Sequence, residues 1–249
     1  MAKTSGLGDN LYIAGFDASG DISALGNVGG GPAALDFTAI NKSAMERQGG
    51  VRDGRIEFTA FFNHVPITGG THEKLSALPT SDVILTYCRG TNLGDPAACL
   101  VSKQINYDGT RGTDGAFTFA VSAQANGFGL GWGRQLTAGL RTDTAATQGA
   151  SIDTTAATSF GAQAYVQVTA FTGTDVTVKI QDSADGTTFA DVAGLTFTQI
   201  TAAPTAERIA TAPTATIRQY LRAVTVTTGG FTNLTFSVVV VKNESAVTF

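Results

Sequence analysis

The chain has 249 residues, of which 43% are hydrophobic and 14% are charged, so it can bury one large core or two medium ones. Its formal net charge of -4 excludes the positive field with which a nucleic-acid binder neutralises phosphates. The 30 glycines, with short segments rich in Thr, Val and Phe, favour a mainly all-β fold of short strands and tight turns.

The N-terminal residues and the cysteines bear on where the protein folds. MAKTSGLGDN has no apolar stretch before a cleavage site, and no apolar run approaches a membrane span, so we expect folding in the cytoplasm without membrane insertion. Cys88 and Cys99 encode neither a disulfide framework nor a zinc site, and we expect both to be small core residues. A hairpin centred on Leu93 and Gly94 would place them opposite each other.

Strand patterns fill the first part of the chain. Residues 10–25 alternate apolar and polar side chains around a bend, which predicts two short strands. The glycine-rich residues 26–32 predict a loop, residues 33–40 resume an extended pattern, and the polar residues 41–54 form a connection that is long for a hairpin. Residues 55–63 have a clear period of two and predict a strand.

A short helix is predicted over residues 71–78, where Thr71 offers an N-cap and Pro79 ends the pattern. Further strands are expected over residues 83–88, 98–107 and 116–125, with turn-rich segments between them. Together these elements predict an antiparallel β-sandwich or barrel with one short helix.

A second domain is predicted after residues 142–158, which are rich in Thr and Ala and have no period. We place the boundary near Gly149, giving domains 1–149 and 150–249. The second domain predicts an Ig-like or jelly-roll-like β-sandwich, with strands over residues 162–171, 175–182, 195–200, 219–226 and 234–241.

Four glycines alternate with larger residues in the sequence between the two domains' main strand patterns. In an extended strand, one face at Gly127, Gly129, Gly131 and Gly133 would carry no side chain, which predicts close backbone packing within the domain or against another subunit. The alternation continues afterwards and no helix begins, so a dinucleotide-binding fingerprint is excluded.

The sequence offers little for catalysis. His64 and His72 are the only histidines, and a cation held with Glu73 or Asp53 is a weaker interpretation than two surface-loop histidines. Asp53 and Glu57 lie across a turn-to-strand transition, which indicates a turn aspartate and a solvated strand residue rather than a catalytic carboxylate pair.

Two further ligand motifs are incomplete. Residues 26–32 lack the Lys and Ser or Thr of a P-loop, and the loop with Asp182, Asp185 and Asp191 lacks the spacing of a calcium cage. We therefore expect a protein that is not an enzyme and has no catalytic, cofactor-binding or metal-binding residue.

Residues of about 10–135 resemble the major tail proteins, or tail tube proteins, of long-tailed bacteriophages. The matching stretches are SGDISAL at Ser19 to Leu25, AALDFTAINKSAMERQGGVRDGRIEFTAFFN at Ala33 to Asn63, and the short helix before ALP. The later stretches QDSADGTTFADV and RQYLRAVTVTT resemble accessory β-sandwich modules at the C-termini of phage tail and capsid proteins.

This resemblance implies a structural virion protein that assembles with itself into hexameric rings, whose inner strands form one continuous barrel. The rings would stack into a tube around the tape-measure protein, bounded by tail terminator and distal tail proteins, and DNA would pass through the lumen without specific binding. The implied location is the virion tail, with the accessory domain outside the tube.

The long polar segment 41–54 is the candidate for contact between stacked rings, because loops of this length in compact domains are usually functional. Its candidate residues are Lys42, Glu46, Arg47, Arg52 and Asp53. Its alternative interpretation is an ordinary mobile loop.

Other virion roles stay open at this point. A head decoration or adsorption protein would also fit an outward sandwich, and a surface glycan is a further partner to consider. The sugar platforms would come from Tyr165, Phe189, Tyr220 and Phe231, which are equally interpretable as core residues.

Overall fold

The structure is a computed structural model that describes residues 7–64, 70–78 and 80–246. These residues form sixteen strands and one short helix, so the prediction of a mainly all-β, antiparallel fold is confirmed. Contacts divide the chain into two compact units. Unit 2 comprises Asp21–Val83 and Leu100–Leu130, and unit 1 comprises the described residues before, between and after these segments.

Unit 2 is built on one antiparallel sheet with the order β3-β4-β7-β6. The bounds are β3 (Ile22–Asp36), β4 (Arg47–Phe61), β7 (Phe117–Ala125) and β6 (Pro96–Arg111), whose part from Leu100 onward belongs to this unit. On β4, Ile56, Phe58 and Ala60 are buried, as the period of two predicts for residues 55–63.

The hairpin of β3 and β4 corrects two predictions. The predicted loop at residues 26–32 lies inside β3, and residues 47–54 of the predicted connection lie inside β4. Glycine permits this pairing, because a Cβ atom at Gly30 would lie 2.6 Å from the Cα atom of Gly54. Three register shifts accommodate the irregular sequence, so the glycines mark bulged strand rather than loop.

The predicted short helix is confirmed as α1 (Thr71–Leu75), but its predicted cap is wrong. Gly70 occupies the N-cap position, and the Thr71 hydroxyl instead donates to Asp21 Oδ2 at 2.7 Å. At the other end, Gln104 Nε2 donates to the Leu75 carbonyl at 2.7 Å. These two hydrogen bonds attach the helix to the segment before β3 and to β6.

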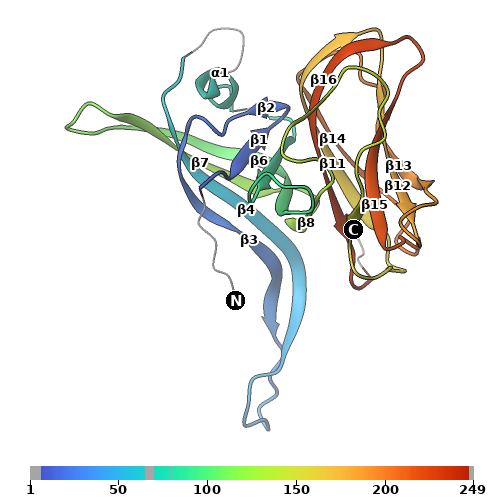
Figure 1. The fold of residues 1–249 in the computed structure, drawn as a ribbon. Helices are drawn as coiled ribbons and strands as arrows, with labels where there is room; N and C mark the ends of the chain where they lie inside the picture. Colours follow the sequence, from blue (N-terminus) through green and yellow to red (C-terminus); the bar gives the residue numbers. More distant parts are fainter. Residues whose placement is uncertain (1–6, 65–69, 79, 247–249) are drawn as a thin grey trace. The chain divides into compact units, whose positions relative to one another are not determined.

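Unit 1 contains two antiparallel sheets (Figure 1). The first has the order β14-β11-β16-β8-β6-β5-β1-β2, with β9 also paired to β16, and the second has the order β10-β15-β12-β13. The bounds in the first sheet are β14 (Thr205–Ala210), β11 (Ala162–Gly173), β16 (Phe231–Lys242), β8 (Gly131–Gln135), β5 (Val83–Cys88), β1 (Asn10–Ile13), β2 (Phe16–Asp17) and β9 (Arg141–Asp143). Those in the second are β10 (Ile152–Asp153), β15 (Tyr220–Val226), β12 (Thr177–Ser183) and β13 (Ala190–Thr196).

The two sheets of unit 1 enclose one hydrophobic core. Val166 and Phe236 from β11 and β16 belong to the same buried cluster as Ile180 and Leu221 from β12 and β15. Side chains from facing strands of two sheets form the core of a β-sandwich. Four of the five predicted strands of this region are present as β11, β12, β15 and β16. The strand predicted over residues 195–200 is wrong in position, because β13 spans Ala190–Thr196 and shares only Leu195 and Thr196 with it. β14 is an additional strand whose residues are half-buried without alternation, except for the exposed Ala210.

The Thr- and Ala-rich segment 142–158 is bonded to β15. The Gly149 N–H donates to the Ala223 carbonyl at 2.9 Å, and the Thr147 N–H donates to the Thr225 hydroxyl at 2.9 Å. Gly149 therefore lies within unit 1, and the chain passes between the units near Gly20, Val83, Cys99 and Leu130.

Both cysteines are buried and free. Cys99 Sγ lies 3.9 Å from the Thr86 hydroxyl, so its neighbour across the strands is Thr86. Burial raises the pKa of the Cys88 thiol to about 12 and that of Cys99 well above its usual value. Within the described ranges, the single helix is far too short to traverse a bilayer.

Candidate assembly surface

The outer half of the β3–β4 hairpin is uncovered by its own chain. We define the distal arm as residues 32–52, where Pro32 pairs with Arg52 and Asp36 pairs with Arg47. No residue of the distal arm is buried, and the two strands run as a ribbon to their own tip (Figure 1). A ribbon of two strands with neither face covered lacks the hydrophobic face that stabilises a sheet in water.

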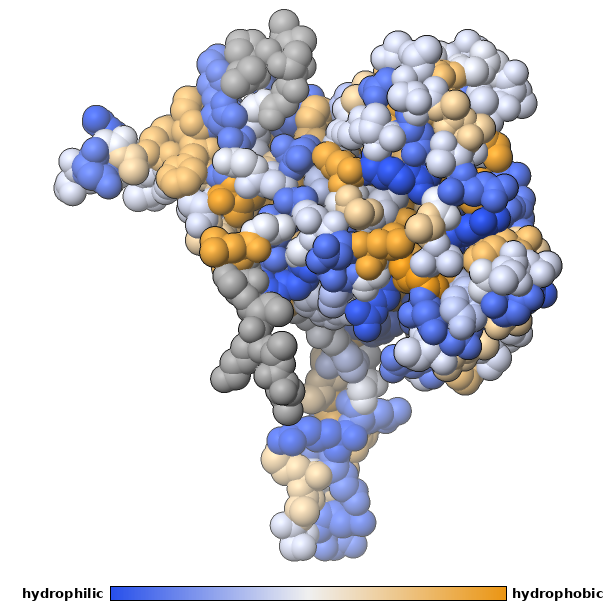
Figure 2. Space-filling model, in the orientation of Figure 1, coloured by the Kyte–Doolittle hydropathy of each residue, from blue (hydrophilic) through white to orange (hydrophobic). Residues whose placement is uncertain are grey.

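Several exposed residues of the distal arm are large and apolar. They are Leu35, Phe37, Ile40, Met45 and Val51, with Ile40 and Val51 the most exposed at 108% and 85%. Figure 2 shows apolar and polar side chains mixed along this ribbon. Grouped exposed apolar side chains mark surfaces that bind another molecule.

Hydrogen bonds fix the connection at the arm's tip. Asp36 Oδ1 accepts from the Thr38 N–H at 2.9 Å and from its hydroxyl at 2.5 Å, which lowers the pKa of Asp36. The Glu46 N–H donates to the Thr38 hydroxyl at 2.8 Å, and the Phe37 N–H donates to the Glu46 carbonyl at 2.9 Å. The apolar residues of the tip are therefore presented on an ordered turn.

The five charged candidates of this region fall into two groups. Lys42 and Glu46 lie in the connection and form an ion pair at 2.9 Å. Arg47, Arg52 and Asp53 are strand residues of β4, which corrects their assignment to a loop. Arg52 and Asp53 are adjacent in a strand, so their side chains point to opposite faces.

The four candidate glycines do not share one strand. Gly127 lies in the turn after β7 with φ +74° and open space around it, and a Cβ atom at Gly129 would lie 3.1 Å from Arg52 Cβ. Gly131 and Gly133 lie in β8, where a Cβ atom at Gly133 would lie 2.8 Å from Val241 Cγ2. The neighbours that require small residues here belong to the same chain.

The unit 2 sheet ends in two unpaired edges within the described residues. β3 pairs with β4 alone, and the end of β6 from Tyr107 to Arg111 pairs with β7 alone. A long exposed edge presents a row of unsatisfied N–H and C=O groups that another strand can bond. The two edges belong to different strands and differ in sequence.

The two histidines belong to an aromatic cluster in unit 2. Their ring centroids are 6.0 Å apart; His72 Nδ1 lies 3.0 Å from the Tyr107 hydroxyl, and His64 Nδ1 lies 3.0 Å from Glu73 Oε1. Phe62 contacts both histidine rings. Over the residues that the structure describes, no three His, Cys, Asp or Glu side chains gather closely enough to hold a metal ion.

The aromatic residues considered as sugar platforms are occupied within the chain. Tyr165 and Phe231 are buried, and the Arg222 guanidinium lies 4.1 Å above the Phe189 ring. The Tyr220 ring lies 3.4 Å from the position of a Cβ atom at Gly186. Two of the four are therefore core residues, and Phe189 and Tyr220 are half-buried beside side chains or backbone of the same unit.

The three aspartates considered for a calcium site, Asp182, Asp185 and Asp191, also have partners in the chain. Asp182 Oδ2 accepts from the Arg218 N–H at 2.9 Å, and Asp191 accepts from Lys179 Nζ at 3.0 Å. Asp185 Oδ1 accepts from the N–H groups of Thr188 and Thr187, and these bonds, with that to Thr188 the largest cause, lower the pKa of Asp185. Each carboxylate thus stabilises a turn or a strand pair.

Comparison with known proteins gives only distant likenesses. No protein-family model and no curated protein matches the chain. A chain from the virion of a native gene transfer agent particle is 14% identical with a TM-score of 0.41, covering 52% of this chain and 98% of its own length.

Two further solved structures span more of the sequence. The SPP1 Dit protein, described as a hub adsorption apparatus of phages infecting Gram-positive bacteria, is 11% identical with a TM-score of 0.33, covering 92% of this chain and 98% of its own. A phage p2 baseplate chain is 9% identical with a TM-score of 0.37, and the match covers 95% of this chain and 99% of the baseplate chain. Each TM-score is low, so these likenesses do not decide what this chain does.

Proposed function

We propose that the chain is a structural protein of a phage virion that assembles with copies of itself into stacked rings, forming the tail tube. The observation that carries the proposal is the unit 2 sheet, whose edges are open and whose distal arm leaves its apolar residues uncovered. The sequence resemblance to tail tube proteins supplies the expected hexameric ring, with the tape-measure protein inside.

Ring formation follows from the two unlike edges. When the edge of one copy binds a different edge of the next, the contact is heterologous, and such contacts close into rings when the rotation permits. Closure into a barrel removes every free edge, including that of β3, which is fifteen residues long. Residues lining such a barrel would be those on one face of the unit 2 sheet.

Stacking of rings is assigned to the distal arm. Its tip carries Phe37, Ile40 and Met45, which are all more than half exposed, beside the ion pair of Lys42 and Glu46. Burying such apolar side chains contributes roughly 25 cal/mol per Å² removed from water. Stacked copies would therefore gain stability where one copy alone gains none.

The charge of the chain suits a conduit rather than a binding surface. The net charge is -4, and DNA held by many basic side chains would not move through a channel. The proposal therefore places DNA in the lumen without specific contacts and assigns no catalytic role to the chain. Tail terminator and distal tail proteins would bind the ends of the tube.

Electron microscopy of the purified chain over a range of concentrations tests this function. Rings or tubes with a central hole are expected, whereas monomers at every concentration and ionic strength would exclude the proposal. Trimers, or binding to capsids, would favour the alternative of a head decoration or adsorption protein.

One substitution separates stacking from ring closure. Ile40→Asp places a charge in the apolar tip, and we expect rings to persist while tubes are lost. Leu7→Asp is the matched control, because Leu7 is also strongly exposed, at 89%, and lies outside unit 2. Tubes formed equally by both variants would show that the distal arm does not join the rings.

A further inference from the structure

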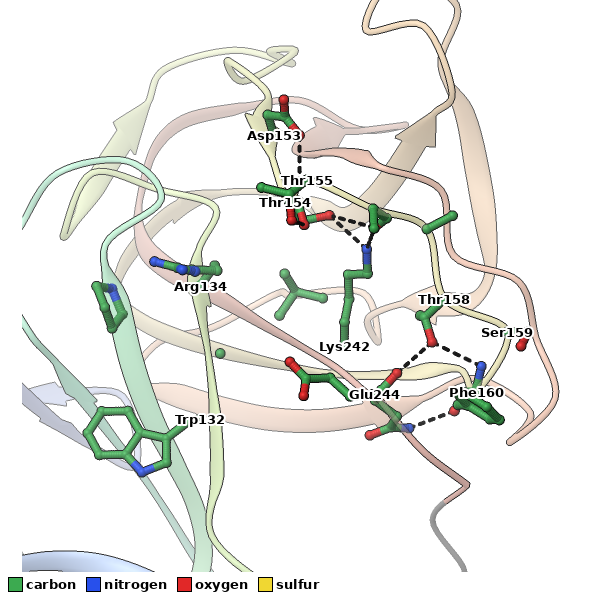
Figure 3. A pocket seen from close by; sticks show the side chains of 16 residues that line it. Trp132, Arg134, Asp153, Thr154, Thr155, Thr158, Ser159, Phe160, Lys242 and Glu244 are labelled. Atoms are coloured by element: carbon green, nitrogen blue, oxygen red, sulfur yellow. Dashed lines mark hydrogen bonds between the residues drawn. The ribbon is translucent and has the colours of Figure 1, made fainter.

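A cavity of about 670 Å³ opens in unit 1 beside the C-terminal end of β16 (Figure 3). Its walls come from β8, from the segment 153–160 and from residues 242–244. The residues that matter to its chemistry are Trp132, Arg134, Asp153, Phe160, Lys242 and Glu244. Its volume lies within the range of roughly 300–1,000 Å³ that small-molecule sites occupy.

Two aromatic side chains of this pocket keep open ring surface. Trp132 is 51% exposed and Phe160 is 37% exposed, in contrast to the covered aromatic residues of the sandwich. Trp132 stands in β8 between Gly131 and Gly133, whose positions face the opposite side of the strand, and Arg134 is its neighbour on the same face. The Tyr87 ring meets the indole edge-to-face with centroids 6.5 Å apart, which holds its orientation.

Hydrogen bonds hold the wall opposite Trp132, which consists of segment 153–160 and residues 242–244. Lys242 Nζ donates to the Thr154 hydroxyl at 2.7 Å and also to the Ala156 carbonyl. The Thr158 hydroxyl donates to the Asn243 carbonyl at 2.5 Å, and Asn243 Nδ2 returns a bond to the Phe160 carbonyl at 2.8 Å. Figure 3 shows these bonds joining the segment to the end of β16, so the wall is ordered before any ligand enters.

The pocket has both donors and acceptors available. Arg134 is exposed, and its hydrogen bond in the described structure runs from Nη1 to the Gly94 carbonyl at 3.2 Å. Asp153 Oδ1 accepts from Gln219 Nε2 at 2.8 Å, which lowers the pKa of Asp153 and keeps it ionised. Glu244 adds a second exposed carboxylate, so two acidic and two basic side chains balance.

We propose that this pocket binds a neutral oligosaccharide. The CH face of a hexose packs on an exposed aromatic ring, while its hydroxyls both donate and accept hydrogen bonds. Carboxylates accept from those hydroxyls and a guanidinium donates to them, and such bonds to charged groups are stronger than neutral ones. Because the two carboxylates and the two basic side chains of the pocket balance, a neutral saccharide suits it better than a strongly charged one.

This inference is independent of tube assembly, because every lining residue belongs to unit 1 of a single chain. A chain that stays monomeric would keep the pocket, and a chain that forms tubes without binding saccharide would leave the assembly proposal intact. An experiment can therefore contradict the assembly proposal or the saccharide proposal without contradicting the other.

The sole tryptophan of the chain is Trp132, so its fluorescence reports directly on this pocket. The full chain is titrated with maltotetraose, cellotetraose and chitotetraose, and with a heparin tetrasaccharide as the anionic probe. A saturable shift of the emission to shorter wavelength with a neutral probe is expected. Saturation with none of the three neutral probes, or with heparin alone, would overturn the proposal.

Variants assign the signal to the pocket. Arg134→Ala removes an exposed charged donor and is expected to weaken the apparent affinity about tenfold, as loss of a charge-assisted hydrogen bond implies. Arg218→Ala is the matched control, because Arg218 is exposed and does not line the cavity. Equal affinities for both variants and the unchanged chain would count against the assignment. Saturation-transfer NMR should show binding retained by Trp132→Phe, which keeps an aromatic ring, and lost by Trp132→Ala; full binding by Trp132→Ala would also count against the assignment.

Discussion

The C-terminal sandwich of unit 1 and the distal arm of unit 2 use similar strand residues with opposite outcomes. In the sandwich, Val166, Ile180 and Phe236 are almost fully buried in a shared core. In the distal arm, Leu35 lies in β3 and Val51 lies in β4, yet they remain 45% and 85% exposed. A β pattern therefore tells which segments form strands but does not tell whether a second sheet of the same chain covers them.

Truncating a large apolar side chain in each region should give the largest difference in the free energy of unfolding. Phe236→Ala removes a fully buried ring and is expected to cost about 3–5 kcal/mol in the free energy of unfolding. Phe37→Ala removes a ring that is 61% exposed and should change it by less than about 0.5 kcal/mol. Chemical denaturation measures both, and a comparable loss at Phe37 would mean that the arm is packed within the monomer.

Breaking a buried ion pair of the sandwich should also cost more stability than breaking an exposed ion pair of the arm. Asp143 is buried in unit 1, where its Oδ2 accepts from Arg141 Nη2 and from the Thr225 hydroxyl, each at 2.8 Å. Asp143→Ala leaves the guanidinium without its carboxylate and should cost about 3 kcal/mol. In the arm, Glu46→Ala breaks an exposed pair with Lys42 and should cost at most about 1 kcal/mol. Denaturant midpoints of the two variants that coincide would contradict this difference.

A glycine substitution tests how tightly β8 packs on β16. A Cβ atom at Gly133 would overlap the Val240 carbonyl, so Gly133→Ala should destabilise unit 1 by about 1–3 kcal/mol. Gly20→Ala is the control, because nothing lies within 4 Å of a Cβ atom there. Thermal unfolding of the pair measures the effect, and an unchanged Tm for Gly133→Ala would show that the strands separate easily.

The smallest expected effect is a change in thermal stability at acidic pH. Hydrogen bonds from Gln181 and then Lys179 lower the pKa of Asp191 in the sandwich, so its contribution to stability is present above the ordinary value of 3.8 and is lost as the pH falls through the lowered one. In Asp191→Asn, Tm should fall less steeply than in the unchanged chain as the pH drops below 4. Asp36→Asn should leave the fall of Tm unchanged, because Asp36 orders an arm that buries nothing; a similarly reduced fall would couple the arm to global unfolding.

The sequence predicted the fold where side chains alternate. Residues 55–63 and the strands around Val166 and Phe236 have a core on one face, so their periodicity carries the information. It failed for β3, where the glycines near Gly30 indicate a turn but serve a close strand pair, and for β14, which is half-buried without alternation except for the exposed Ala210. Local patterns do not distinguish a glycine needed for a turn from one needed for close approach.

The pocket could not be predicted from the sequence for a different reason. Trp132, Asp153 and Lys242 are far apart in the chain and meet only through sheet pairing and the hydrogen bonds of Lys242. The available signal was a tryptophan flanked by two glycines. Those glycines predict backbone contact on one face of the strand and place the tryptophan ring on the other face, but they do not indicate that the ring is exposed.

The order in which unit 1 acquires its strands follows from the position of β16. This strand pairs with β8, β9 and β11, yet it is the last strand of the described chain. A ribosome therefore releases every strand of unit 2 while the central position of the unit 1 sheet is still empty. Chains fold from their N-terminal parts during synthesis, so the edges of unit 2 exist before unit 1 can close. The time between these two events is set by the translation of residues 131–242, at about 5–20 residues per second.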